Sequence, residues 1–435
     1  LFANDPSVRT SIGASNRYDA FTIRGLRVAN SDVAVNGLFG LLPNWRIGVD
    51  SVERIDLLKG PGAFMFGMAP GGAVGGTVDL ATKRAGDVPL TELTTGYSSE
   101  SMLGAHVGVG RRFGENKAFG VRLNLGASGG DTPYDRASAH TRDASLGLDY
   151  KSERLRLSSD VIYQRDRTRA QERGYSLARG VVLPHAPDPK INLSQDYDYS
   201  RSSSTTAMAR AEYDLGESVM AYATFGFNTF HFDKREVSGG SILNHGGDIL
   251  VSANAQQVGQ YNTQTGEAGL RWIFATGPIS HELTVSVNSL HQAYKLGQVA
   301  HADYISNIYG PVYTDTPVTS AYPEGRANEL TLDSLAIADT LSWRDGLVAL
   351  TLGGAATKRR VQELRTSLGG NNTALRRICV NTCGRGGDPP APATFLLCQL
   401  RPGAYARTRA ARQRDQLGRR VCAVQVEAVR GRHQT

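Results

Sequence analysis

The chain has 435 residues, of which 40% are hydrophobic, enough for two or three ordinary domains or one large barrel. Its mean hydropathy is −0.30 and it holds no run of about 18 apolar residues, which excludes a helical membrane span. The 49 glycines show no Gly-X-Y period, which excludes collagen, so the composition favours short strands joined by turns.

The formal net charge of +7 is unevenly distributed along the chain. Residues 355–435 hold sixteen basic and four acidic residues, a net charge of +12, whereas residues 1–354 carry a net charge of −5. All four cysteines, Cys379, Cys383, Cys398 and Cys422, also lie in this last part. The two parts therefore differ in the kind of sequence that they contain.

The chain begins at Leu1, without a start methionine or a secretory leader, so we expect it to be a fragment at its N-terminus. Residues 1–90 read as a compact segment of short strands, around residues 20–23, 33–35, 52–58 and 77–80, separated by glycine-rich turns. Six glycines and two prolines in residues 61–76 predict a tight irregular loop there.

Beyond residue 90 apolar and polar residues alternate, as in residues 121–125, 146–150 and 283–287. Roughly a dozen such strands are predicted between residues 91 and 354, each about 9 to 11 residues long, the length of a tilted strand that crosses a bilayer. Aromatic residues lie near the strand ends, for example Tyr150 and Trp343.

The connections predict a transmembrane barrel. Residues 151–154 and 215–218 are tight turns, whereas residues 165–204 and 295–326 are long loops, and short turns on one side with long loops on the other are typical of such barrels. A soluble β-sandwich also alternates, but its turn signals usually recur every 8 to 12 residues or so. Periodicity alone leaves both architectures open.

An ordered series of motifs in the first ninety residues resembles the plug domain of TonB-dependent outer-membrane receptors. The series comprises FTIRGL (21–26), VNGL (35–38), SVERIDLLKGP (51–61), FG (66–67), PGGAV (70–74) and VDLATKR (78–84). The motif residues carried over from the family are Arg24, Gly25, Glu53, Arg54, Lys59, Gly60, Pro61, Gly67, Pro70, Gly71 and Gly72. Their order and spacing are similar to those of the second half of a plug.

Residues 334–343 (SLAIADTLSW) resemble the siderophore-receptor branch of this family. The resemblance implies an α+β plug domain followed by a transmembrane antiparallel β-barrel, 22-stranded in the family and roughly half present here. The expected parts are the C-terminal part of the plug at 1–90, the N-terminal part of the barrel at 91–354, and an out-of-frame, disordered tail at 355–435.

The resemblance also implies a function: active transport of ferric siderophores across the outer membrane of a Gram-negative bacterium. The implied partners are the ferric siderophore, the TonB energy-transducing complex and outer-membrane lipid, with no nucleic acid and no enzymatic activity. Another scarce large solute, such as a cobalamin or an oligosaccharide, is an alternative cargo, and a non-functional pseudogene product is a further alternative.

Candidate ligand contacts follow from the family's two plug apices. Arg24 matches an arginine that contacts the siderophore in hydroxamate-type relatives, and guanidinium groups donate forked hydrogen bonds to chelate oxygens. Pairing of Arg24 with a plug or wall carboxylate is the alternative. Phe39, Gly40 and Leu41 occupy the second apex, where Leu41 and Leu42 put a hydroxamate ligand in doubt, and Trp45 either lines the pocket or packs the plug.

Two further groups of side chains are candidates for contacts in the lumen and loops. The plug charges Glu53, Arg54, Lys59, Lys83 and Arg84 are expected either as ion pairs with the barrel wall or as solvated charges. Aromatic rings suit a bulky chelate, so the loop tyrosines are the second group. They are Tyr197, Tyr199, Tyr304, Tyr309, Tyr313 and Tyr322.

No catalytic motif competes with this interpretation. The histidines are scattered without metal-ligand spacing, and no Gly-x-Ser-x-Gly or phosphate-binding loop occurs. We therefore expect no protein cofactor and no metal ligand, since the iron arrives inside its chelate.

The last 81 residues invite three explanations. Cysteine spacings of 4, 15 and 24 residues fit no common zinc pattern, and the arginines alone make a weak case for nucleic acid. The third explanation is a change of reading frame near Gly354 or Ala355, because shifted codons for residues 375–383, 398–403 and 421–431 permit barrel-like sequence. Sequencing the DNA for residues 350–358 tests this hypothesis.

Overall fold

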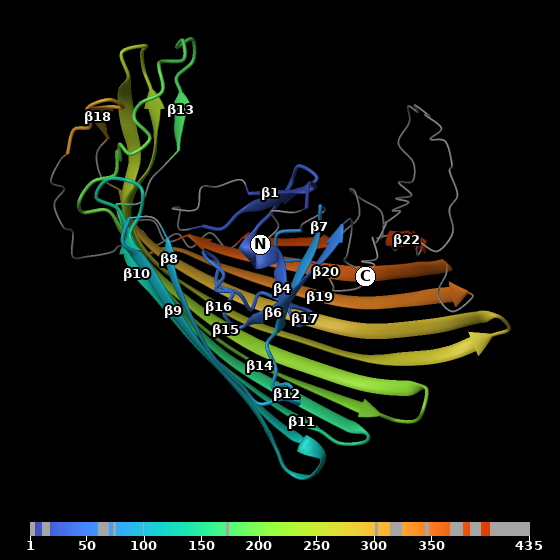
Figure 1. Ribbon diagram of the computed structural model, residues 1–435. Coiled ribbons are helices and arrows are strands. Elements are labelled where there is room, and N and C mark those ends of the chain that lie inside the picture. Colours follow the sequence, from blue (N-terminus) through green and yellow to red (C-terminus); the bar gives the residue numbers. More distant parts are fainter. Residues whose placement is uncertain are drawn as a thin grey trace, which may run out of the picture.

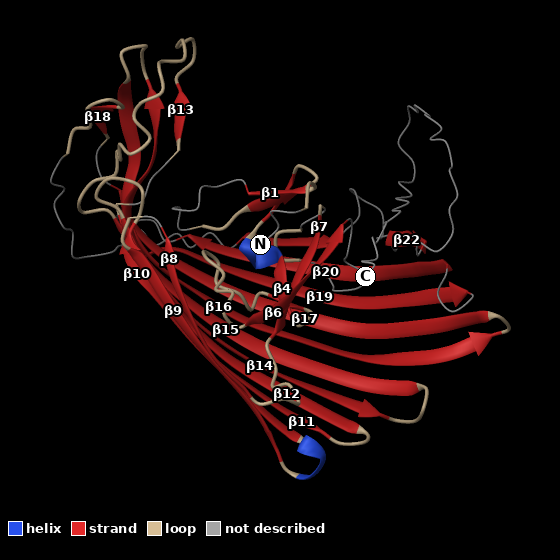
Figure 2. Cartoon of the chain, in the orientation of Figure 1, coloured by secondary structure: helices blue, strands red, loops and turns tan. Residues whose placement is uncertain are grey.

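A computed structural model describes residues 5–10, 18–59, 69–72, 75–98, 100–170, 174–300, 303–313, 324–343, 348–365, 377–382 and 393–400. In these residues nearly all regular structure is β-strand, with two single-turn 3₁₀-helices, η1 (Asn30–Asp32) and η2 (Glu115–Lys117) (Figure 2). The chain forms one large curved sheet with a smaller body, the plug, on its concave face (Figure 1).

No helix in the described part of the chain is long and apolar enough to cross a membrane.

The plug contains two small sheets. The first is three-stranded and antiparallel, in the order β1–β2–β3. The second has the order β5–β4–β7–β6, in which β4 and β7 run parallel. The strands are β1 (Val8–Thr10), β2 (Phe21–Ile23), β3 (Leu26–Val28), β4 (Val33–Val35), β5 (Leu38–Phe39), β6 (Val52–Lys59) and β7 (Gly76–Thr82).

The large sheet, here called the wall, is an antiparallel array whose main path runs from β8 to β21 in chain order, with β13, β18 and β22 added at its margins. Its strands are β8 (Leu90–Ser98), β9 (Met102–Phe113), β10 (Phe119–Asp131), β11 (Ser138–Lys151), β12 (Leu155–Arg169), β13 (Tyr175–Leu177), β14 (Tyr199–Asp214), β15 (Val219–Ile242), β16 (Asp248–Thr276), β17 (Ile279–Ala300), β18 (Tyr304–Asn307), β19 (Glu324–Trp343), β20 (Val348–Arg365), β21 (Arg377–Thr382) and β22 (Ala393–Leu400).

The tight turns lie where the sequence predicts them, at residues 152–154 and 215–218. The predicted long loops, 165–204 and 295–326, are shorter than predicted, because residues 165–169, 199–204 and 295–300 belong to β12, β14 and β17 and because β13 and β18 lie inside them. The strands are longer than predicted, however, with 24 residues in β15 and 29 in β16. The excess lies at the long-loop end, where β13 and β18 pair with these strands and keep the ladder hydrogen-bonded (Figure 1).

The two faces of the wall have opposite polarity. On β10 and β11 the outward Leu125 and Leu148 are 45% and 42% exposed, whereas the inward Arg122 and Asn124 are 4% and 2% exposed. A soluble sandwich buries its apolar face, so this reversed pattern favours a sheet surrounded by lipid with a polar interior. The alternation of apolar and polar residues left a soluble sandwich and a membrane barrel open. The polarity of the two faces decides for the membrane barrel.

The wall does not end at Gly354, which the sequence predicts to be the last residue of the barrel part. β20 continues to Arg365, and its pairing with β19 runs from Val348 to Arg365 without a shift of register. Arg360 of β20 also forms an ion pair with Asp333 of β19. β21 and β22 pair with β20 as well. The predicted frame change and the domain boundaries stay predictions, and residues 401–435 lie outside the described residues.

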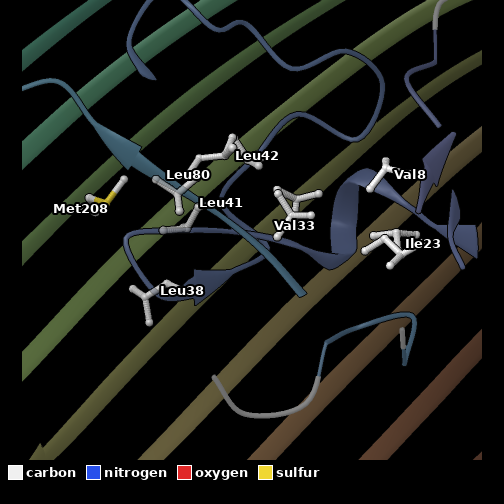
Figure 3. Close-up of a cluster of buried hydrophobic side chains, with 11 residues drawn as sticks. Val8, Ile23, Val33, Leu38, Leu41, Leu42, Leu80 and Met208 are labelled. Atoms are coloured by element: carbon white, nitrogen blue, oxygen red, sulfur yellow. The ribbon is translucent and has the colours of Figure 1, made fainter. Parts of the chain in front are cut away.

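An apolar cluster joins the plug to the wall. Plug side chains such as Val33, Leu41 and Leu80 pack together, and Met208 of β14 reaches into the same cluster (Figure 3). Leu41 is 1% exposed, and its carbonyl accepts a 2.6 Å hydrogen bond from Thr206 Oγ1. Burial of this surface fixes the plug on the middle of the wall.

A partly buried ion pair joins the two bodies nearer the short turns. Arg84 Nη2 donates to Asp160 Oδ2 at 2.5 Å, and Nη1 donates to the carbonyl of Ser159 at 3.1 Å. Of the five plug charges, Arg84 thus confirms the expectation of a wall ion pair. Lys59 and Arg54 pair within the plug, with Asp5 and Asp56, and Glu53 and Lys83 form no ion pair among the described residues.

Substituting Arg84 by Gln should destabilise the folded chain by about 3 kcal/mol, because Asp160, only 5% exposed, is left without its cation. Urea unfolding in detergent micelles measures the change. Arg54→Gln is the control: Arg54 is 69% exposed beside Asp56, and its loss should cost less than about 1 kcal/mol. Equal effects of the two substitutions would contradict the assigned role of Arg84.

Asp79 makes the stability of the plug depend on pH. It lies on β7 opposite Asp56 and accepts a 3.0 Å hydrogen bond from the Gly37 N–H. Burial raises the pKa of Asp79 above its ordinary value of 3.8, in spite of that hydrogen bond. The folded chain therefore holds the Asp79 proton to a higher pH than the unfolded chain does.

The sign of the effect follows from this difference. As pH rises above 3.8, the unfolded state loses its proton first, so the contribution of Asp79 to the unfolding free energy declines through the folded pKa. Asp79→Asn should remove this decline, seen as a flatter dependence of the urea midpoint on pH above pH 3.8. Asp87→Asn, at an exposed position, should leave the slope as it is. A slope unchanged by Asp79→Asn would refute the prediction.

Candidate functional site

The three-stranded sheet of the plug lies at its outer end, away from the short turns. Tyr18, three residues before β2, packs with Trp45 against Phe230 and Phe232 of β15. These two rings lie further from the 215–218 turn than Gly226, the β15 residue against which Leu41 packs. The β1–β2–β3 sheet is therefore displaced toward the side of the long loops.

Arg24 occupies the turn between β2 and β3, where both turn residues need a left-handed backbone. Arg24 has φ 52° and Gly25 φ 81°, and the Arg24 N–H donates to the Ser7 carbonyl at 2.8 Å. The Arg24 side chain is exposed, and no carboxylate among the described residues pairs with it. Its role in binding ligand stays a prediction, and the turn geometry keeps its guanidinium in solvent.

The second predicted apex is packed against the wall. Phe39 is 5% exposed and contacts Leu290 and Leu332. At Gly40, with φ 79°, a Cβ would lie 2.7 Å from Thr263 Cγ2, so wall and plug approach too closely for a side chain. Together with the buried Leu41, these residues face the wall in this structure, and a ligand reaches them only if the plug moves.

Trp45 is held in an aromatic cluster. Its ring lies 5.5 Å from that of Phe230, 4.9 Å from that of Phe232 and 5.8 Å from that of Tyr18, measured between ring centroids. The indole is 5% exposed. Of the two roles that the sequence left open for Trp45, the structure displays packing of plug on wall, and ligand contact stays a prediction.

The glycine motif of the plug has a structural cause at Gly71. Its N–H donates to Asp32 Oδ1 at 2.6 Å, and a Cβ there would lie 2.5 Å from Asp32 Oδ2. Burial raises the pKa of Asp32. Gly72, after Pro70, needs a φ of 73°. The other residues of this loop named in the sequence analysis, Gly60, Pro61 and Gly67, lie outside the described residues.

The loop tyrosines mostly tie the loops together. Tyr304 Oη accepts from Gln195 Nε2 at 2.7 Å, and burial raises the pKa of Tyr304. Tyr309 Oη donates to the His185 carbonyl at 2.8 Å. The Arg136 guanidinium lies 3.7 Å from the Tyr313 ring centroid, a cation–π contact. Tyr322 lies outside the described residues.

Two arginines that no sequence motif marks share the outer sheet with Arg24. Arg9 of β1 and Arg27 of β3 are both exposed and both stand opposite Thr22 of β2. The signal in the sequence is their alternation with the buried Val8 and Val28, but only the strand register brings them into one row. In the described residues no group of three or more His, Cys, Asp or Glu could hold a metal ion.

Comparison with known proteins identifies both parts of the chain. A family model described as the TonB-dependent receptor plug domain matches residues 1–74. The ferrichrome receptor FcuA of Yersinia enterocolitica is 32% identical over 355 residues, which are 80% of this chain and 47% of FcuA.

Solved structures agree with the sequence match. The ferric preacinetobactin receptor BauA of Acinetobacter baumannii superposes with a TM-score of 0.81 at 32% identity, over 90% of this chain and 57% of BauA. The siderophore receptor PiuA of the same species, at 14% identity, shares the fold with a TM-score of 0.73, over 89% of this chain and 57% of PiuA.

The chain thus spans about half the length of these relatives. Its plug sits on the polar face of a sheet whose other face is apolar. The chain belongs to the TonB-dependent outer-membrane receptors.

Proposed function

We propose that the chain is the plug and the first part of the barrel of a receptor that takes ferric siderophores across the outer membrane of a Gram-negative bacterium. The observation that carries the proposal is the match at 32% identity to two receptors named for iron chelates, ferrichrome and ferric preacinetobactin. The plug on the polar face of the wall supports it, because a plugged lumen suits a scarce solute that must be captured before it is admitted.

In this proposal the chelate binds at the outer end of the plug and the long loops surround it. Arg24 offers the chelate a forked, permanently charged donor. The iron stays inside its chelate, so the protein supplies hydrogen bonds and rings but no metal ligand. Loop tyrosines already held by neighbours, such as Tyr304 and Tyr313, present a preformed surface that costs little entropy to order.

Entry then requires the plug to leave the wall. The contacts to be broken are the apolar cluster around Leu41, the aromatic cluster around Trp45 and the Arg84–Asp160 ion pair. We propose that the TonB complex supplies the work that breaks these contacts, by pulling on the plug from the side of the short turns. A channel opens where plug and wall separate.

Binding of iron-labelled chelates by the full chain in detergent micelles tests this function. The chain, with its strand content checked by circular dichroism, should retain a ferric tris-catecholate or a ferric tris-hydroxamate saturably, and cyanocobalamin and maltoheptaose not at all. Arg24→Ala should weaken retention about tenfold, because one charge-assisted contact is lost. Arg154→Ala, in the exposed turn at the other end of the wall, is the control. Saturable binding of cobalamin or the oligosaccharide, or of no ferric chelate, would refute the proposal.

A further inference from the structure

The outer face of the three-stranded plug sheet carries a row of side chains unlike the rest of the plug. Arg9 on β1 stands opposite Thr22 on β2, and Thr22 stands opposite Arg27 on β3. Directly opposed residues of an antiparallel sheet project from the same face. The neighbouring positions Val8, Ile23 and Val28 project from the other face and are buried in the plug core.

The spacing in this row suits two cations around a bound anion. Adjacent strands lie about 4.8 Å apart, so the backbones of Arg9 and Arg27 are separated by about 10 Å. Thr22 between them is short and ends in a hydroxyl that accepts or donates a hydrogen bond. Arg24, in the turn that follows β2, adds a third guanidinium beside the row.

Within the described part of the chain, the three guanidinium groups have no carboxylate partner. Arg9 and Arg27 are exposed, and neither forms an ion pair with a carboxylate among the described residues.

Four acidic residues of the plug are engaged elsewhere. Asp5 binds Lys59, Asp56 binds Arg54, and Asp19 accepts from the Ile47 N–H, while Asp32 accepts from the Gly71 N–H. A positive field therefore remains at this end of the plug.

We propose that Arg9, Thr22 and Arg27, together with Arg24, form an anion-recognising floor that selects negatively charged ferric chelates, those with catecholate or carboxylate arms, over neutral ones. This inference rests on the proposed function and names its substrate class. A ferric tris-catecholate is a trianion, whereas a ferric tris-hydroxamate is neutral. Guanidinium groups bind planar, oxygen-rich anions through paired hydrogen bonds, and they attract the trianion from a distance as well.

Removal of the two flanking charges tests the selection. The full chain carrying Arg9→Gln and Arg27→Gln is compared with the unsubstituted chain for binding of a ferric tris-catecholate and a ferric tris-hydroxamate. Affinity for the trianion should fall at least about tenfold, and affinity for the neutral chelate should stay within about twofold. The unsubstituted chain should also lose affinity for the trianion as salt is raised, because exposed charges are screened.

Two further variants separate charge from structure. Arg9→Lys with Arg27→Lys keeps both charges and should retain most of the preference for the trianion, losing only what the forked geometry adds. Lys151→Gln with Arg154→Gln removes two exposed cations at the short-turn end of the wall, away from the row and the long loops, and should leave both affinities unchanged.

The outcomes distinguish failure of this inference from failure of the proposed siderophore function. If both chelates bind equally well and the Arg9 and Arg27 substitutions change neither, the row is ordinary solvated surface: the inference is wrong and the siderophore function stands. If the neutral chelate binds more tightly than the trianion, the inference is likewise wrong. If no ferric chelate binds, the proposed function fails, and the inference fails with it.

Discussion

The structure depends on one constraint. The wall has an apolar outer face and a polar inner face, and each face needs surroundings of matching polarity. Lipid accommodates the outward leucines of strands such as β10 and β11, but inward groups such as Arg122 and Asn124 need polar partners. Arg122 finds Glu92 and Asn124 finds Ser145 within the wall, and the plug supplies others, as where Gln164 bonds the backbone of Gly48. The plug thus supplies the inner face with some of the polar partners that water would otherwise provide.

The same constraint sets how the plug is held. Apolar and aromatic contacts, around Leu41 and Trp45, lie in the middle of the wall and further toward the loops, and the Arg84–Asp160 pair lies nearer the short turns. A force applied from the side of the short turns meets the ion pair first. Asp160 is paired across the sheet with Met208 of the apolar cluster, so rupture of the ion pair also opens the edge of that cluster to water.

Much of the fold could be predicted from the sequence, because strand alternation and tight turns are local signals. The turns at 152–154 and 215–218 and the plug motifs are of this kind. Residues 39–41 show the limit: the sequence marks an apex, but only the placement of plug on wall reveals that Phe39 and Leu41 face Thr206 and Leu290 rather than solvent. The row formed by Arg9, Thr22 and Arg27 could not be predicted from the sequence for a related reason, because it depends on the register of three strands. The full length of β20 was not predicted, because the basic residues after Gly354 look like the start of a disordered tail, although pairing with β19 continues through them.

Hydrogen exchange of the full chain in detergent micelles, read by mass spectrometry, tests most directly whether the plug is seated on the wall. The account predicts that the amides of β4 and β7, which lie at the centre of the plug sheet, exchange as slowly as those of β11 and β12. Exchange of β4 and β7 as fast as the exposed 215–218 turn, with β11 and β12 still protected, would show a wall without a seated plug and contradict it.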